Sequence, residues 1–105
     1  MNHEEFQSFL LAQHAREEDL LLAKSKEYAS DSDKLWNLKA GAAALGDTPE
    51  MYALYLMQKH LTSVRDLCMF EGKRTPQMIA EKFGDARAYL LLIMALMMEQ
   101  SGETK

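Results

Sequence analysis

Several features that would indicate a disulfide-bonded, β-rich or nucleic-acid-binding protein are missing from this sequence. The 105 residues include one cysteine, Cys68, which excludes an internal disulfide and any zinc site built from Cys-x-x-Cys pairs. Two prolines and five glycines are too few for the many turns of a β-sandwich or barrel. Basic residues number 12 against 16 acidic ones, and a net charge of −4 leaves nothing to neutralise a row of phosphates. We therefore expect a globular protein that binds no nucleic acid.

The sequence also lacks a hydrophobic run long enough to cross a membrane. Residues 86–98 are apolar except for Arg87, but a transmembrane helix needs about 20 such residues. We expect this run to be a helix buried on most sides, in the centre of a bundle or at a subunit interface. The acidic N-terminal residues carry no signal-peptide pattern, so the expected location is the cytoplasm, with no membrane partner.

Helical periodicity is present over nearly the whole chain. Phe6, Leu10, Glu17 and Leu21 follow one another at spacings that place them on one helix face, and no segment alternates as a strand does. Short connections favour antiparallel neighbours. The sequence predicts an all-α protein, a single domain of residues 1–105 forming an antiparallel four-helix bundle that dimerises. Its helices are expected at about residues 2–28, 33–45, 48–71 and 75–100.

Capping residues mark most of these helix ends. Asn2 with Glu5 three residues later is typical of a capping box. Gly46 follows the second helix, where a left-handed C-terminal residue is favoured. Thr48 and Thr75 are each followed by proline, which is the usual order at a helix N-terminus.

Carboxylates are the main candidates for chemistry, because nucleophile elbows, P-loops, dinucleotide fingerprints and HExxH motifs are absent. Glu17 lies on an apolar helix face, and Glu81 and Asp85 are four residues apart, so they share a helix side. A carboxylate at the edge of a buried seam needs a basic partner or a divalent cation. The basic residues available for this are Lys24, Lys26, Lys59 and Arg65.

A single pocket is predicted from the polar residues on or beside the inward helix faces. Glu81 and Asp85 are its candidate catalytic residues. A Mg²⁺ ion would be held by oxygen ligands from Glu17, Glu27, Glu81 and Asp85. The candidate ligand-binding residues are Lys24, Glu27, Tyr28, Trp36, Lys59 and His60, with the lysines meeting phosphate and Trp36 stacking on a base. In the alternative interpretation, the same residues form a salt-bridge network without a ligand.

The order of several short motifs resembles that of a group of small phage and prophage proteins. The matching residues are Lys24 to Tyr28, then Asp33, Leu35, Asn37 and the stretch 40–46, then Lys59-His60, and lastly Asp85 with Tyr89. This group resembles the all-α nucleoside triphosphate pyrophosphatases of the MazG and dimeric dUTPase superfamily. The resemblance implies a Mg²⁺-dependent dimer or tetramer, in the host cytoplasm, that hydrolyses the α–β bond of a (deoxy)nucleoside triphosphate.

The superfamily signature is incomplete in this chain. Asp85 occupies the position of the final aspartate, but Lys82 stands three residues before it and Glu81 is displaced by one. Either the site uses other ligands or the chain is a non-catalytic member. Three functions stay open: a nucleotide pyrophosphohydrolase-like protein, a phage-encoded interaction protein that regulates or inhibits a host system, and a helical subunit used for assembly alone.

Overall fold

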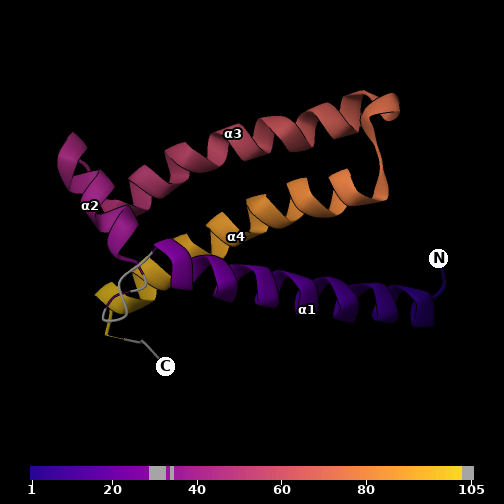
Figure 1. Cartoon of the computed structure of the whole chain (residues 1–105), viewed down its shortest axis with the longest axis horizontal. Helices are drawn as coiled ribbons and strands as arrows, with labels where there is room; N and C mark the ends of the chain where they lie inside the picture. Colours follow the sequence, from indigo (N-terminus) through magenta and orange to yellow (C-terminus); the bar gives the residue numbers. More distant parts are fainter. Residues whose placement is uncertain (29–32, 34, 103–105) are drawn as a thin grey trace.

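In the part of the chain that the computed structural model describes, all regular secondary structure is helical (Figure 1). That part comprises residues 1–28, 33 and 35–102, with the side chains of 24–28 left out. The elements are α1 (His3–Tyr28), α2 (Trp36–Leu45), α3 (Pro49–Met69), the 3₁₀ turn η1 (Glu71–Lys73) and α4 (Pro76–Gln100). The all-α prediction is confirmed. No helix within these described ranges has the length and apolar character that crossing a membrane requires.

The predicted helix caps are present. The Asn2 carboxamide accepts a hydrogen bond from the Glu5 amide at 2.8 Å, and the Glu5 carboxylate accepts one from the Asn2 amide at 3.1 Å. The hydroxyl oxygens of Thr48 and Thr75 each accept from the amide three residues later. Gly46 ends α2 with a φ of 69°, a left-handed conformation that glycine adopts without a steric penalty. Local chemistry therefore sets these ends.

The second helix begins later than predicted, at Trp36 and not at residue 33. The Asp33 carboxylate accepts a hydrogen bond from the Leu35 amide at 3.0 Å and pairs with Lys39 at 2.7 Å. An aspartate that bonds to the backbone two residues later forms a turn, which here precedes the helix.

The third helix is shorter than predicted, ending at Met69 and not at residue 71. Phe70 is extended, with φ −121° and ψ 94°. The Arg74 guanidinium then donates to the carbonyl oxygens of Leu67 and Cys68, at 2.7 and 3.1 Å. These bonds satisfy carbonyls at the helix end that have no intrahelical partner, so the chain can turn at this point.

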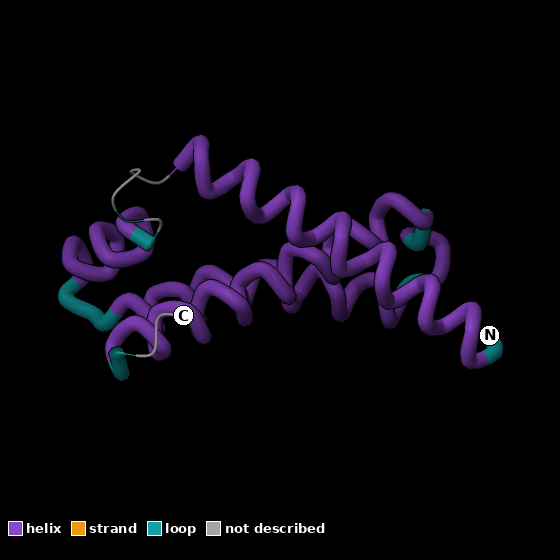
Figure 2. Tube along the Cα trace, turned by 90° about the horizontal axis from the view of Figure 1, so that it is seen from below, coloured by secondary structure: helices purple, strands orange, loops and turns teal. Residues whose placement is uncertain are grey.

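The two long helices α3 and α4 form an antiparallel hairpin (Figure 1). At its open end, the Gln100 side chain donates a hydrogen bond to the Glu50 carboxylate. The short helix α2 packs on α3, and Lys39 joins it to Glu99 of α4 at 2.6 Å. Helix α1 meets α4, and toward its C-terminal end it rises away from the hairpin (Figure 2).

The buried core of one chain is small. Its buried apolar residues in the described part are Ala42, Ala53, Met57, Leu67, Ala86 and Leu96. The accessible surface is 7763 Å², whereas a compact protein of 12.0 kDa exposes about 6,000 Å². The radius of gyration is 15.6 Å against about 13 Å for a compact domain of this length. A single copy therefore leaves much of its surface uncovered.

Much of that uncovered surface is apolar and lies on α4. We call the exposed side chains of its C-terminal half the α4 apolar face; they are Leu90, Leu91, Met94, Met97 and Met98. Their spacing places them on one side of the helix. In a single chain this part of α4 is exposed, so burial of residues 86–98 on most sides would need a subunit interface, the second of the two places expected for this run. Helix α1 adds further exposed apolar side chains at Phe6, Phe9 and Leu10.

Candidate functional site

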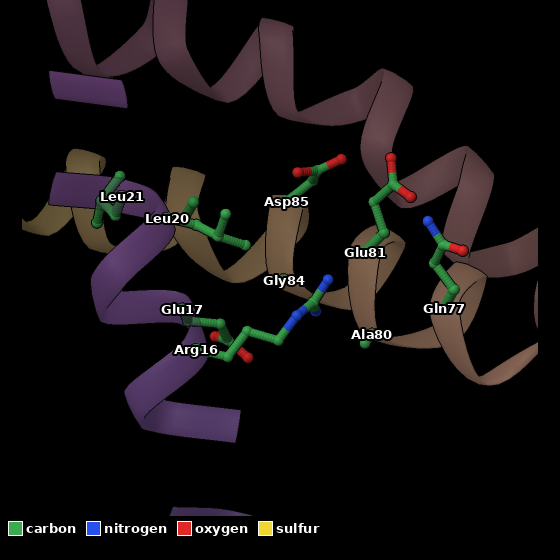
Figure 3. Close-up of a pocket in the computed structure, with 10 residues that line it drawn as sticks. Arg16, Glu17, Leu20, Leu21, Gln77, Ala80, Glu81, Gly84 and Asp85 are labelled. Atoms are coloured by element: carbon green, nitrogen blue, oxygen red, sulfur yellow. The ribbon is translucent and has the colours of Figure 1, made fainter. Parts of the chain in front are cut away.

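A cleft of about 400 Å³ lies between α1 and α4 (Figure 3). Helix α1 contributes Arg16, Glu17, Leu20 and Leu21 to its walls. The polar residues that α4 contributes are Gln77, Glu81 and Asp85. The cleft is large enough for a small-molecule ligand and combines apolar with charged side chains, as binding sites do.

Helix α1 crosses α4 at Gly84. A Cβ atom at this position would lie 3.6 Å from the Cγ of Glu17, so α1 passes directly over the glycine. Glu81 and Asp85 flank this crossing on α4, one turn apart. The crossing thus brings carboxylates from two distant parts of the sequence to one cleft.

Glu17 and Arg87 form the main polar link between α1 and α4. Arg87 Nε donates to Glu17 Oε1 at 2.8 Å, and Arg87 Nη2 donates to Glu17 Oε2. The Glu17 side chain is 13% exposed and that of Arg87 is 43% exposed. The hydrogen bonds and charge of Arg87 lower the pKa of Glu17, while the same pairing raises that of Arg87. Both groups are therefore charged at neutral pH.

Asp85 and His60 connect the cleft to α3. His60 Nδ1 lies 3.7 Å from Asp85 Oδ2, and both side chains are about a quarter exposed. The His60 ring stacks on Tyr89, with 5.0 Å between the ring centres. Burial raises the pKa of the Tyr89 hydroxyl, and the nearby Tyr52 and Asp85 act in the same direction. Tyr89 therefore keeps its proton at neutral pH and presents a neutral hydroxyl.

Arg16 contains an unusual buried donor. Its Nη1 atom is shielded from solvent and has no hydrogen-bond partner in the described part of the chain. The Oε1 atom of Gln13, one turn earlier, is in the same condition. Buried polar atoms in folded proteins almost always have partners, so each exception requires an explanation.

The structure brings together some of the predicted site residues and separates others. Glu17, Glu81 and Asp85 line one cleft, and His60 contacts Asp85. Three predicted ligand-binding residues do not line this cleft: His60 reaches it only through Asp85, Lys59 is exposed on α3, and Trp36, 53% exposed, begins α2. The predictions for Lys24, Glu27 and Tyr28 concern side chains outside the described residues.

The carboxylates that line the cleft do not converge on one point. Glu81 and Asp85 turn toward α3, whereas Glu17 remains beside Arg16 (Figure 3). Within the ranges that the structure describes, no three His, Cys, Asp or Glu side chains are grouped so that they could hold a metal ion. The described carboxylates therefore do not fit a multi-carboxylate Mg²⁺ site.

Two arginines of this region were not among the predicted site residues. Arg87 had a visible signal, because it is the one charge inside the apolar run 86–98. A charge in such a run needs a buried partner, and Glu17 provides it. Arg16 gave no comparable signal, since its position next to Glu17 is ordinary on a solvated helix.

In comparisons with known proteins, no family model, no curated protein and no solved structure matches this chain.

Proposed function

We propose that this protein binds a nucleoside triphosphate or a related phosphorylated nucleotide in the cleft between α1 and α4. The observation that carries the proposal is the position of Glu17, Glu81 and Asp85, three of the predicted site carboxylates, around one cleft. The resemblance to the all-α nucleoside triphosphate pyrophosphatases supports the same ligand class. Apolar side chains from Leu20 and Leu21 offer surface to a sugar or base.

The proposal is for binding, and hydrolysis does not follow from the described residues. Both carboxylate oxygens of Glu17 accept hydrogen bonds from Arg87, and no metal-holding group forms among the described side chains. Mg²⁺ enters the proposal only as the ordinary counterion of a nucleotide triphosphate.

A thermal-shift panel of ribo- and deoxynucleoside triphosphates, with and without Mg²⁺, tests this function. A ligand at a hundred times its Kd stabilises the native state by about 2.7 kcal/mol, so a bound nucleotide should raise the Tm by several degrees. With Mg²⁺ present, Asp85→Asn should reduce the shift, because the carboxylate attracts the cation that the nucleotide carries. Loss of the Asp85–His60 pair, which is partly exposed, should lower stability by about 1 kcal/mol or less.

Asp19→Asn is the matched control, because Asp19 is exposed on α1 and does not line the cleft. This variant should keep the nucleotide response of the wild type. A wild-type Tm that no nucleotide raises, with or without Mg²⁺, would refute the proposed function.

A second candidate is a non-catalytic protein that acts by associating with protein partners, and the α4 apolar face favours it. We propose a second copy of this chain as the occupant of that face, which would complete an antiparallel four-helix bundle across a dimer. The chain exposes about 1,800 Å² more than a compact protein of its mass, and a stable dimer takes about 800 Å² from each partner. The excess, which includes exposed surface of α1 as well as of α4, is about twice what one partner contributes to such an interface. The same surface suits a host protein, the partner expected under the phage-regulator interpretation.

A further inference from the structure

We propose that Arg16 binds a phosphate group in the cleft between α1 and α4. This inference rests on the proposed nucleotide-binding function and names the residue that meets the phosphate chain. Arg16 was not among the residues that the sequence or the family resemblance suggested.

Among the described residues, Arg16 has an unpartnered donor. Guanidinium groups present five N–H donors in a planar fork, and the buried Nη1 of Arg16 has no acceptor in the described part of the chain. Its neighbour Glu17 is engaged through both oxygens by Arg87. Leaving a buried charged donor unpaired is costly, so an acceptor from outside the chain would stabilise this arrangement.

The Arg16 side chain lines the cleft. Arg16 extends from α1 toward α4 and lies close to Gly84 and Ala80 (Figure 3). Both residues are small, so they place no bulky side chain beside Arg16, and a phosphate accepts paired hydrogen bonds from a guanidinium fork. Arginine is suited to this contact because its charge does not titrate at physiological pH.

Two acidic residues line the same cleft as Arg16. Glu81 and Asp85 turn toward α3 and away from Arg16 (Figure 3). Their negative charge nevertheless opposes a polyphosphate that carries no cation. Binding of the phosphate chain should therefore be stronger with Mg²⁺ than without it. Without Mg²⁺, Glu81→Gln should strengthen binding.

Isothermal titration with inorganic triphosphate and with ATP, each with and without Mg²⁺, tests the role of Arg16. Arg16→Gln should weaken binding of both probes by about tenfold to a hundredfold, the usual effect of losing a charge-assisted pair of hydrogen bonds. Arg16→Lys keeps the charge but loses the fork, so binding should weaken less. Arg65→Gln is the matched control, because Arg65 is exposed on α3 and does not line the cleft.

The thermal stability of the unligated variants separates ligand binding from a structural role. If Arg16 serves a ligand, Arg16→Gln removes an unpaired buried donor, and the Tm without ligand should stay the same or rise. A fall in that Tm together with unchanged affinity would overturn the proposal. If Arg16→Gln does not fold, Arg16→Lys decides the question, and affinity equal to wild type would count against Arg16.

Failure of this inference is distinguishable from failure of the proposed function. If nucleotides raise the Tm equally in wild type and Arg16→Gln, the proposed role of Arg16 is refuted, whereas nucleotide binding by the protein is supported. A second result would be that inorganic triphosphate binds through Arg16 as tightly as every nucleotide does. That result would support the anion site and would refute the proposal that the protein recognises a nucleotide. Equal losses in Arg16→Gln and Arg65→Gln would indicate unspecific attraction and refute the site.

Discussion

Arg87 on α4 donates two hydrogen bonds to the two carboxylate oxygens of Glu17 on α1, and this pair joins residues 70 positions apart in the chain. It fixes the position at which α1 crosses α4 over Gly84. The Glu17 carboxylate is nearly buried, whereas the Arg87 guanidinium is partly exposed. Water around the guanidinium screens its charge and so weakens the attraction between the two groups. The cleft depends on this crossing, because its walls come from both helices.

Replacing Glu17 by glutamine should lower the free energy of unfolding by about 1 kcal/mol at neutral pH, a value reduced for the exposure of Arg87. Arg87 lowers the pKa of the folded-state carboxylate below the ordinary value of 4.5. The stabilisation is therefore fully present above that ordinary value and is lost as the pH falls through the folded-state pKa. Urea unfolding between about pH 7 and pH 3 should show the difference between wild type and Glu17→Gln shrinking toward acid.

The neighbouring variant Glu18→Gln is the control for this experiment. Glu18 is exposed on the same helix, and the change is chemically identical. It should leave the unfolding free energy nearly unchanged over the whole pH range. An equal effect of the two substitutions would show that the Glu17–Arg87 pair contributes nothing particular.

Two glycines inside helices should respond in opposite directions to alanine. A Cβ at Gly41 would lie 2.5 Å from ring atoms of Tyr52, whereas the nearest such contact at Gly84 is an ordinary 3.6 Å. Gly41→Ala should therefore destabilise the protein by about 1–3 kcal/mol through overpacking against α3. Gly84→Ala should stabilise it by about 0.5–1 kcal/mol, because alanine is the better helix former. Chemical denaturation of both variants measures the difference, and shifts of the same sign would contradict the packing of α2 on α3.

Charge placed on the α4 apolar face should separate the proposed dimer. We expect wild type to show twice the chain mass by light scattering at micromolar concentration, and Met97→Asp to show the mass of one chain. An aspartate at this position would be an unpaired charge in an apolar interface. Leu45→Asp is the control, because Leu45 is highly exposed at the end of α2, outside this face. A monomeric wild type would refute the dimer.

The features predictable from the sequence are those decided within a few residues. The capping bonds of Asn2, Thr48 and Thr75 and the left-handed Gly46 depend on chemistry that lies within one helical turn. The bounds were less accurate at residues 33 and 71, where side chains of Asp33 and Arg74 replace helical bonds with turn or end contacts. A periodic pattern alone does not contain that information.

The site was harder to predict because its partners are distant in sequence. The periodicity correctly indicated that Glu17 faces a neighbouring helix, but lysines and Arg65 were offered as partners and Arg87 is the one observed. Which residue of α4 lies opposite Glu17 depends on the crossing point at Gly84, a property of three-dimensional packing. The burial of Arg16 Nη1 depends on the same crossing.

The way α1 is attached also implies an order of events during folding. Helices α3 and α4 are joined by a short connection through η1, so their contacts form with little loss of chain entropy. The contacts of α1 with α4 close a much longer loop and bury little apolar surface. We therefore expect the hairpin to form first and α1 to dock last. The amide protons of α1 should accordingly exchange with solvent at a lower opening free energy than those of α3, so the cleft can open without unfolding the hairpin.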